Sequence, residues 1–234
     1  MHQQATITLA GVINRLDLEY GARNTPILQL RLDGRIENPG EDGETITRTY
    51  RHHVRVIGAY AASLRTALQE GQPAIAHGRL EQFRYTTKAG EDRNVIRIIA
   101  DGVSLLTGNE PTITTESGRE LLERGKNLVT IVGRLTHEPQ LKANRSGDAY
   151  LQTGVAVEEY GSTHYFNITA WRSLAQRLAQ ASKGDAIHLT GQLVNHTWKD
   201  QNGNTRHTVS IEARDAHTLK YARPKPAPRQ AQAA

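Results

Sequence analysis

An internal repeat limits the fold of this 234-residue chain more than any other feature. The segment Ile7–Ile13 aligns with Val129–Leu135, and the triplet Gly78-Arg-Leu aligns with Gly191-Gln-Leu. The spacing between the two copies is far longer than the roughly 20–50 residues of a solenoid unit. The repeat therefore indicates a duplicated domain.

Strand patterns are clearest in the second copy. The seven residues of Tyr165–Trp171 alternate, so Tyr165 and Trp171 lie on one face of a strand. The run Gly191–Trp198 is also β-prone. It leads into the polar turn Lys199–Asn204, with its Asn-Gly pair, and then into a returning run, Thr205–Ile211. These three segments predict a β-hairpin.

The first copy follows the same plan. Ile27–Glu37 and Thr45–Ile57 read as two successive strands. The next segment, Ala59–Glu70, is rich in alanine and leucine and stops at a glycine, which predicts a helix. Arg172–Ser182 is its counterpart in the second copy. Each copy is therefore expected to combine several strands with one helix.

The repeat divides the chain into four parts: a first fold at 1–106, a linker at 107–126, a second fold at 127–221 and a tail at 222–234. Within the linker, Ser117 and Glu120 have the spacing of a capping box, which predicts a short helix. The tail combines proline, alanine and basic residues. Such a composition predicts disorder.

Composition excludes several classes of protein. No run approaches the roughly 20 apolar residues of a membrane span, and the opening Met1–Gln4 is unlike a signal peptide. The chain has no cysteine, which excludes disulfides and thiolate metal sites and fits a reducing cytoplasm. The net charge is +5, but residues 220–234 contribute four basic side chains and no acid. Local patches, and not net charge, would have to attract nucleic acid.

The sequence contains no recognisable catalytic or metal-binding pattern. His52 and His53 are adjacent, so on a strand they face opposite sides and cannot readily chelate one ion together. The scattered Ser, His and Asp residues lack a nucleophile elbow, and no zinc spacing is present. We therefore expect a protein that is not an enzyme and has no metal or cofactor.

Several motifs of the second copy occur in a characteristic order. They are Asn127-Leu-Val-Thr-Ile-Val-Gly, Tyr165-Phe-Asn-Ile-Thr-Ala-Trp-Arg-Ser-Leu, Lys183-Gly-Asp, Gly191-Gln-Leu and Trp198-Lys-Asp. In this order they resemble the bacterial single-stranded DNA-binding protein family, and most closely its form with two copies per chain from the Deinococcus–Thermus group. The resemblance implies an all-β chain of two tandem OB-folds. Each would be a five-stranded Greek-key barrel with one helix between strands 3 and 4.

The resemblance also implies a site for single-stranded DNA. Bases would stack on aromatic rings at about 1–3 kcal/mol each, while cations follow the phosphates. The alternatives are that the aromatic residues form barrel core or a subunit interface, and that the cations are simply solvated. Val194, His196 and Asn167 stand where the family commonly carries arginines. The expected stacking residues are Tyr160, Tyr165, Trp171 and Trp198, and the expected cations are Arg134, Lys142, Arg172, Lys183, Lys199 and Arg206.

The first copy departs further from the family. Tyr85 matches Trp198, whereas Arg51 stands where the second copy has Tyr165. We expect this copy either to contact DNA in a weaker or different way or to serve mainly in assembly. Its expected contact residues are Arg55, Arg79, Phe83, Arg84 and Tyr85.

The sequence thus predicts a cytoplasmic, nucleoid-associated protein that binds single-stranded DNA without strong sequence preference, in replication, recombination or repair. A homodimer would supply four OB-folds. The segment Arg223–Ala234 is basic, unlike the acidic peptide with which the family commonly ends, so partners that dock on such a peptide are not expected. Two alternatives stay open: an accessory protein that bridges partners, and a binder of single-stranded RNA.

Overall fold

The computed structural model describes residues 2–39, 43–87, 90, 92–107, 111–199, 203 and 205–219, without the side chains of Asp92, Trp198, Arg206 and His207. Strands dominate this part of the chain, as predicted. The first copy consists of β1 (Gln4–Tyr20), the short 3-10 helix η1 (Ala22–Asn24), β2 (Pro26–Pro39), β3 (Thr45–Ile57), α1 (Ala59–Ala67), β4 (Pro73–Thr86) and β5 (Asp92–Leu105). The remainder consists of β6 (Ile113–Glu116), β7 (Arg119–Leu122), β8 (Lys126–Leu135), β9 (Gln140–Ala143), β10 (Ala149–Glu159), β11 (Ser162–Trp171), α2 (Arg172–Leu178), β12 (Ala186–Lys199) and β13 (Thr205–Thr218).

Each copy closes into a five-stranded barrel. In the first barrel the order is β2-β3-β5-β4-β1, and pairing of β1 with β2 closes it. In the second barrel the order is β8-β12-β13-β11-β10, closed by pairing of β8 with β10. The helices α1 and α2 each follow the third strand of their barrel. The prediction of two tandem OB-folds is confirmed, although the helices end at Ala67 and Leu178, earlier than the sequence patterns suggested.

The repeated Gly-x-Leu triplets mark equivalent irregularities in the two barrels. The ladder between β4 and β5 shifts register between His77 and Gly78, and the ladder between β12 and β13 shifts between Thr190 and Gly191. A Cβ atom on Gly78 would collide with a carbonyl oxygen of β5, and one on Gly191 would collide with a carbonyl oxygen of β13. Glycine is therefore required at both places because neighbouring backbones approach too closely for a side chain.

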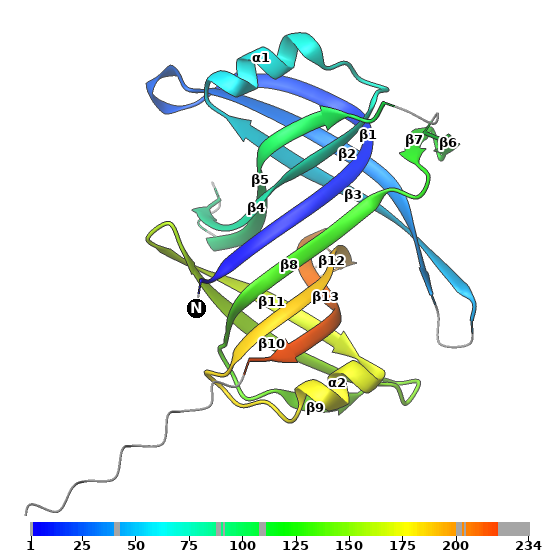
Figure 1. Cartoon of the computed structure of the whole chain (residues 1–234), viewed down its shortest axis with the longest axis vertical. Coiled ribbons are helices and arrows are strands. Elements are labelled where there is room, and N and C mark those ends of the chain that lie inside the picture. Colours follow the sequence, from blue (N-terminus) through cyan, green and yellow to red (C-terminus); the bar gives the residue numbers. More distant parts are fainter. Residues whose placement is uncertain are drawn as a thin grey trace, which may run out of the picture.

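The two barrels share one continuous sheet. β1 pairs antiparallel with β8, and Ile7 lies opposite Val129, its own counterpart in the repeat. Figure 1 shows these strands side by side across the middle of the molecule, with α1 and α2 at opposite ends of its long axis. Thr6 pairs with Thr130 on one side of this pair, and the repeat counterparts of these two residues, Leu128 and Thr8, pair on the other side. The barrels are therefore related by an approximate two-fold axis through this strand pair.

The linker is a β-hairpin, so the short helix predicted there is wrong. β6 pairs with β7, with Glu116 opposite Arg119. The turn residues Ser117 and Gly118 both have positive φ, 52° and 74°, which matches the twist of a hairpin and ends the capping-box pattern. Leu122 packs against Ala10 and Val12 of β1. Apolar contact with the first barrel therefore supports the hairpin.

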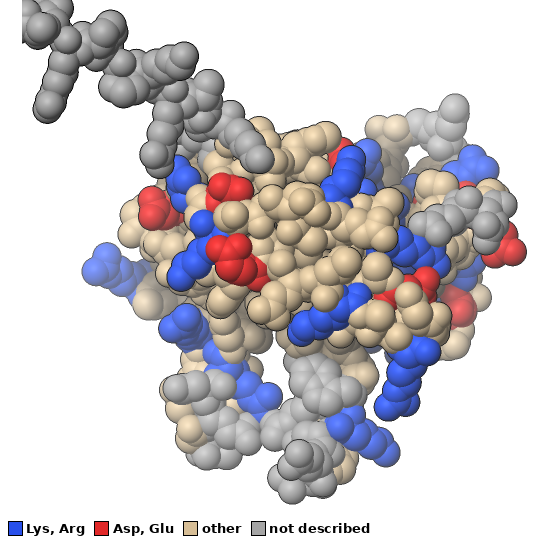
Figure 2. All heavy atoms as spheres, turned by 90° about the horizontal axis from the view of Figure 1, so that it is seen from below, with Lys and Arg blue, Asp and Glu red and all other residues tan. Residues whose placement is uncertain are grey.

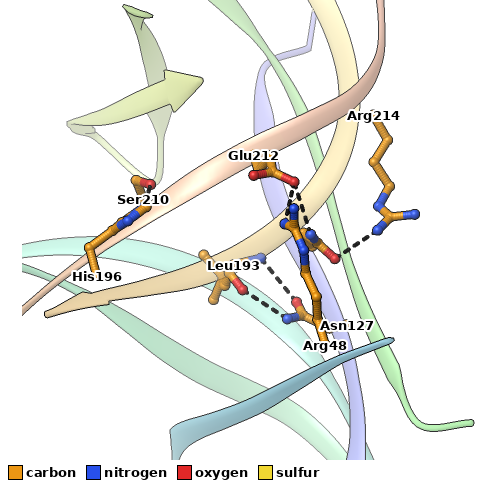
Figure 3. A network of polar contacts seen from close by, with 8 residues as sticks. Arg48, Asn127, Leu193, His196, Ser210, Glu212 and Arg214 are labelled. Atoms are coloured by element: carbon orange, nitrogen blue, oxygen red, sulfur yellow. Dashed lines mark hydrogen bonds and ion pairs between the residues drawn. The ribbon is translucent and has the colours of Figure 1, made fainter. Parts of the chain in front are cut away.

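Polar contacts also join the barrels around the shared strand pair. Arg48 of β3 reaches Glu212 of β13 at 2.5 Å, and Figure 3 shows this pair beside Arg214. Asn127 of β8 lies 3.4 Å from the ring of His52 in β3, Nδ2 to Nε2. Within the second barrel, the same side chain exchanges hydrogen bonds of 2.9 and 3.0 Å with the backbone of Leu193 in β12. These contacts hold the extended β3 strand of the first barrel against β8 and β13 of the second.

Two predictions concern other parts of the chain. The tail at 222–234, predicted to be disordered, lies outside the described residues. Neither helix in the part of the chain that the structure describes is long and apolar enough to cross a membrane.

Candidate nucleic-acid interface

The outer face of β11 carries two exposed aromatic rings. Tyr165 is 48% exposed and Trp171 is 37% exposed, whereas Phe166, Ile168 and Ala170 point into the barrel and are buried. The alternation predicted from the sequence is therefore present. Tyr165 and Trp171 are not core residues. Six residues of strand separate them by about 20 Å, enough for several points of contact with an extended ligand.

The side chain of Trp171 packs against a second aromatic ring on the neighbouring strand. Tyr150 of β10 lies opposite Trp171 in the strand ladder, and their ring centroids are 5.4 Å apart at 36°. Lys142 of β9 is the next residue across the sheet, opposite Tyr150. A cation and two aromatic rings therefore lie in one row across β9, β10 and β11. Arg172, which follows Trp171, contacts Asp148 at 3.3 Å, so its charge is partly compensated.

Tyr160 stands at the turn between β10 and β11. Its φ is 50° and its side chain is 81% exposed. The guanidinium carbon of Arg79, from the first barrel, lies 5.3 Å from the centre of its ring, a cation–π geometry. Arg79 also contacts Glu81 and Asp101, each at 2.8 Å. Arg79 therefore orients Tyr160 while its own charge is largely neutralised.

The remaining predicted cations of the second barrel are spread around its surface. Arg134 donates a hydrogen bond of 3.0 Å to the carbonyl oxygen of Gly184, close in sequence to the exposed Lys183. Lys199 is exposed at the end of β12. Trp198 and Arg206 are opposite one another in the ladder between β12 and β13, but their side chains lie outside the described residues.

The first barrel has an aromatic surface of a different design. Phe83 and Tyr85 of β4 stack with ring centroids 6.1 Å apart, and Tyr85 is 44% exposed. The guanidinium of Arg97 from β5 lies 3.0 Å from the centre of the Phe83 ring. Burial and the nearby Arg55 both lower the pKa of Arg97. Phe83 is therefore covered by a cation, whereas Tyr85 is open to a ligand.

A shallow hollow of about 390 Å³ adjoins Tyr85. The exposed Arg84, an expected DNA-contact residue, also lines this hollow. The other lining residues are Thr86, Arg93 and Asn94.

Sequence reasoning missed two residues that shape these surfaces. Tyr150 lies behind Trp171, and Arg97 covers Phe83. The position of Arg97 could have been predicted. When β4 and β5 are paired as a hairpin with its turn near Gly90, the arginines of β5 lie on the same face as Phe83 and Tyr85. Tyr150 could be placed only once the register between β10 and β11 was known.

Charge is distributed unevenly over the surface. In Figure 2, acidic and basic side chains alternate over the upper part of the view, whereas Lys and Arg predominate in the lower part. Among the described residues, no group of three or more His, Cys, Asp or Glu side chains is placed to hold a metal ion. Local patches of cations and exposed aromatic rings are the chemical features that the described surface offers.

Two closed barrels with exposed outer-face aromatic rings define a tandem OB-fold protein of the kind suited to nucleic acid. The model of the single-strand binding protein family matches residues 126–219. The single-stranded DNA-binding protein of Thermus aquaticus is 32% identical over 224 residues, which cover 93% of this chain and 83% of that protein. That of Deinococcus radiodurans is 27% identical, over 87% and 71% of the respective chains.

The likeness extends to three dimensions. The crystal structure of the wild-type Thermus aquaticus protein has a TM-score of 0.78 at 26% identity, and the match covers 96% of this chain and 97% of that one. The chain belongs to the single-strand binding protein family.

Proposed function

We propose that this protein binds single-stranded DNA without strong sequence preference. The observation that carries the proposal is a set of exposed rings in a member of this family: Tyr165 and Trp171 on the outer face of β11, and Tyr160 at the turn before it. Stacking on a ring tolerates any base because every base has a flat face. The protein would thereby protect transiently single-stranded DNA during replication, recombination or repair, without an enzymatic step.

Cations next to these rings supply the second part of the binding free energy. Lys142 lies in the row with Tyr150 and Trp171, and Lys183 and Lys199 are exposed on the same barrel. Their charges would follow the phosphates of the strand and make binding weaker as salt rises. Arg172 and Arg134 already have protein partners, so we assign them smaller contributions.

The first barrel adds a second, weaker binding surface. Tyr85 is open, and Arg84 and Arg93 lie beside it. Because the barrels are joined through β1 and β8, a strand bound to one barrel is held at high effective concentration near the other. The first barrel thus increases avidity even if its own affinity is low.

A second copy of the chain would dock on the sheet formed by β4, β1, β8 and β12. The outward side chains of these strands alternate with the buried core residues and are mostly uncharged. Arg79 of β4, opposite Thr6, is charged but already contacts Glu81 and Asp101. A sheet face with few charges is suited to packing against its own copy, which would give a homodimer with four barrels. The uncharged outward positions at the centre of this sheet are Thr6, Thr8, Ile75, His77, Leu128, Thr130, Val132, His188 and Thr190.

The proposal is tested by titrating poly(dT) into the protein while following tryptophan fluorescence at several salt concentrations. Both tryptophans, Trp171 and Trp198, belong to the second barrel. We expect strong quenching and an affinity that falls with salt, with a slope of about −0.7 per neutralised phosphate. Competition by poly(U) at equal affinity would favour RNA. Absence of binding at low salt would contradict the proposal and favour a protein-bridging role.

A further inference from the structure

A cleft of about 610 Å³ separates the two barrels on the side where their hairpins meet. One wall is the outer face of β3 and β5, with Arg51, His53 and Asn94. The opposite wall is formed by β12 and β13, and the linker hairpin of β6 and β7 adds Ser117 and Arg119. The volume falls within the range of ligand-binding clefts, and polar and apolar side chains share the lining.

The cleft lies between the hollow beside Tyr85 and the end of β12 that carries Lys199, both assigned above to DNA. Asn94 lines both the cleft and the hollow beside Tyr85. At the other side, Thr197 lines the cleft and immediately precedes Trp198 in β12. A strand that contacts Tyr85 and continues to the hairpin of β12 and β13 therefore crosses the cleft.

The charges in the cleft favour a phosphate. Its two acidic side chains are already paired: Asp33 lies 3.3 Å from both Arg31 and Arg51, and Glu116 contacts Arg35. Arg119 is exposed and makes no ion pair within the part of the chain that the structure describes. Arg119 is thus a cation available to a ligand, on a linker that belongs to neither barrel.

We propose that this cleft binds one nucleotide of single-stranded DNA as the strand passes between the barrels, with its phosphate at Arg119 on the linker hairpin and near Arg51. The inference rests on the proposed function. It makes the linker part of the binding surface, and it makes the strand path continuous from one barrel to the other.

The test compares the affinities of two oligonucleotides for the whole protein. An oligo(dT) of about 8 nucleotides fits the roughly 4–16-nucleotide site of one OB-fold, whereas one of about 30 nucleotides spans both barrels. The variants are Arg119→Glu and Ser117→Asp, both at exposed linker positions. The matched control is Arg65→Glu on the outer surface of α1.

We expect Arg119→Glu to weaken binding of the long oligonucleotide about 5- to 10-fold and to reduce the salt slope by about 0.7, the value for one phosphate. Ser117→Asp should act in the same direction, while the short oligonucleotide and Arg65→Glu show no change. Equal affinities of the Arg119→Glu and Arg65→Glu variants for the long oligonucleotide would overturn the inference, as would an equal loss for both lengths. If the unchanged protein bound neither oligonucleotide, the proposed function itself would fail.

Discussion

The two barrels have the same strand plan but different outer faces. Where the second barrel exposes Tyr165, the equivalent position of the first is Arg51, which is ion-paired with Asp33. Where the second exposes Trp171, the first has Ile57, 46% exposed. Most inward-facing positions are apolar in both barrels, for example Leu28 and Leu151, and Val54 and Ile168. Core alternation and close-packed glycines therefore specify this fold, while residues of the outer face can change and create or remove a binding surface.

One polar contact occurs twice across the approximate two-fold axis. The side-chain amide of Gln82 donates a hydrogen bond of 3.1 Å to the carbonyl oxygen of Tyr165, and that of Asn195 donates one of 2.8 Å to the carbonyl oxygen of Arg51. In both hydrogen bonds the acceptor is a backbone carbonyl oxygen, so the bond does not depend on the side chain of the acceptor residue. The duplicated chain therefore kept its inter-barrel contact while the acceptor side chain changed from aromatic to basic or the reverse.

The largest expected effect is on DNA affinity and separates the aromatic faces of the barrels. The double variant Tyr165→Ala/Trp171→Ala should lose about 2–6 kcal/mol of binding free energy to poly(dT), from about 1–3 kcal/mol per stacked base. The corresponding first-barrel variant, Phe83→Ala/Tyr85→Ala, should lose less, because Arg97 covers Phe83. Filter binding at constant salt measures both.

The control for these variants is Tyr20→Ala, which removes a ring 60% exposed at the end of β1. It should bind as the unchanged protein does. An equal loss of binding free energy in the two double variants would show that both barrels contribute equally to DNA binding, and would contradict the stronger role of the second barrel.

The next effect concerns stability against pH, at a position where the cores differ. His52 in the first barrel corresponds to the buried Phe166 in the second. Burial lowers the pKa of His52 to about 4. The unfolded chain, with a histidine pKa near 6.5, therefore binds more protons than the folded one between pH 6.5 and 4. This contribution to stability is complete above pH 6.5 and is lost as the pH falls toward 4.

Replacing His52 by Phe, the residue of the second barrel, removes this titration. Between pH 6.5 and 5 the unchanged protein should lose about 1.5 kcal/mol of unfolding free energy more than the His52→Phe variant. Urea unfolding at pH 7, 6.5, 6, 5.5 and 5 measures the difference. Parallel pH profiles of the two proteins would show that His52 does not titrate in this way.

The smallest expected effect tests the repeated contact. Gln82→Ala and Asn195→Ala should each lower the unfolding free energy by about 1 kcal/mol, the usual contribution of one hydrogen bond. The side chain of Gln82 also accepts a hydrogen bond from the Tyr165 N–H, but at 3.4 Å this bond is long and adds little. Gln180→Ala, at an exposed position just after α2, is the matched control and should leave stability unchanged. A large loss from only one of the two variants would mean that the two contacts are not equivalent.

Much of the fold followed from local sequence patterns. Period-two alternation located β11 and the β12–β13 hairpin, and the paired Gly-x-Leu triplets located the duplication. The helix predicted in the linker is wrong. Ser117 and Glu120 have the spacing of a helix start, but Gly118 between them favours a tight turn. Local capping preferences lost to turn geometry and to the apolar contact of Leu122 with β1.

The candidate site was only partly predictable. Exposure of Tyr165 and Trp171 follows from alternation, since their neighbours must fill the barrel. The cation–π contact of Arg79 with Tyr160 and the cleft at Arg119 depend on how the two barrels, which are far apart in the sequence, pack together. No local pattern encodes such contacts, because they arise from pairing between β1 and β8.

The proposed function depends above all on stacking of bases on the aromatic face of the second barrel. Its most direct test is photochemical cross-linking of oligo(dT) that carries 5-iodouracil, followed by identification of the modified peptides by mass spectrometry. We predict that cross-links concentrate in residues 160–171, with fewer at Phe83 and Tyr85. Cross-links confined to the first barrel, or spread equally over exposed rings such as Tyr20 and Tyr60, would contradict the proposed stacking.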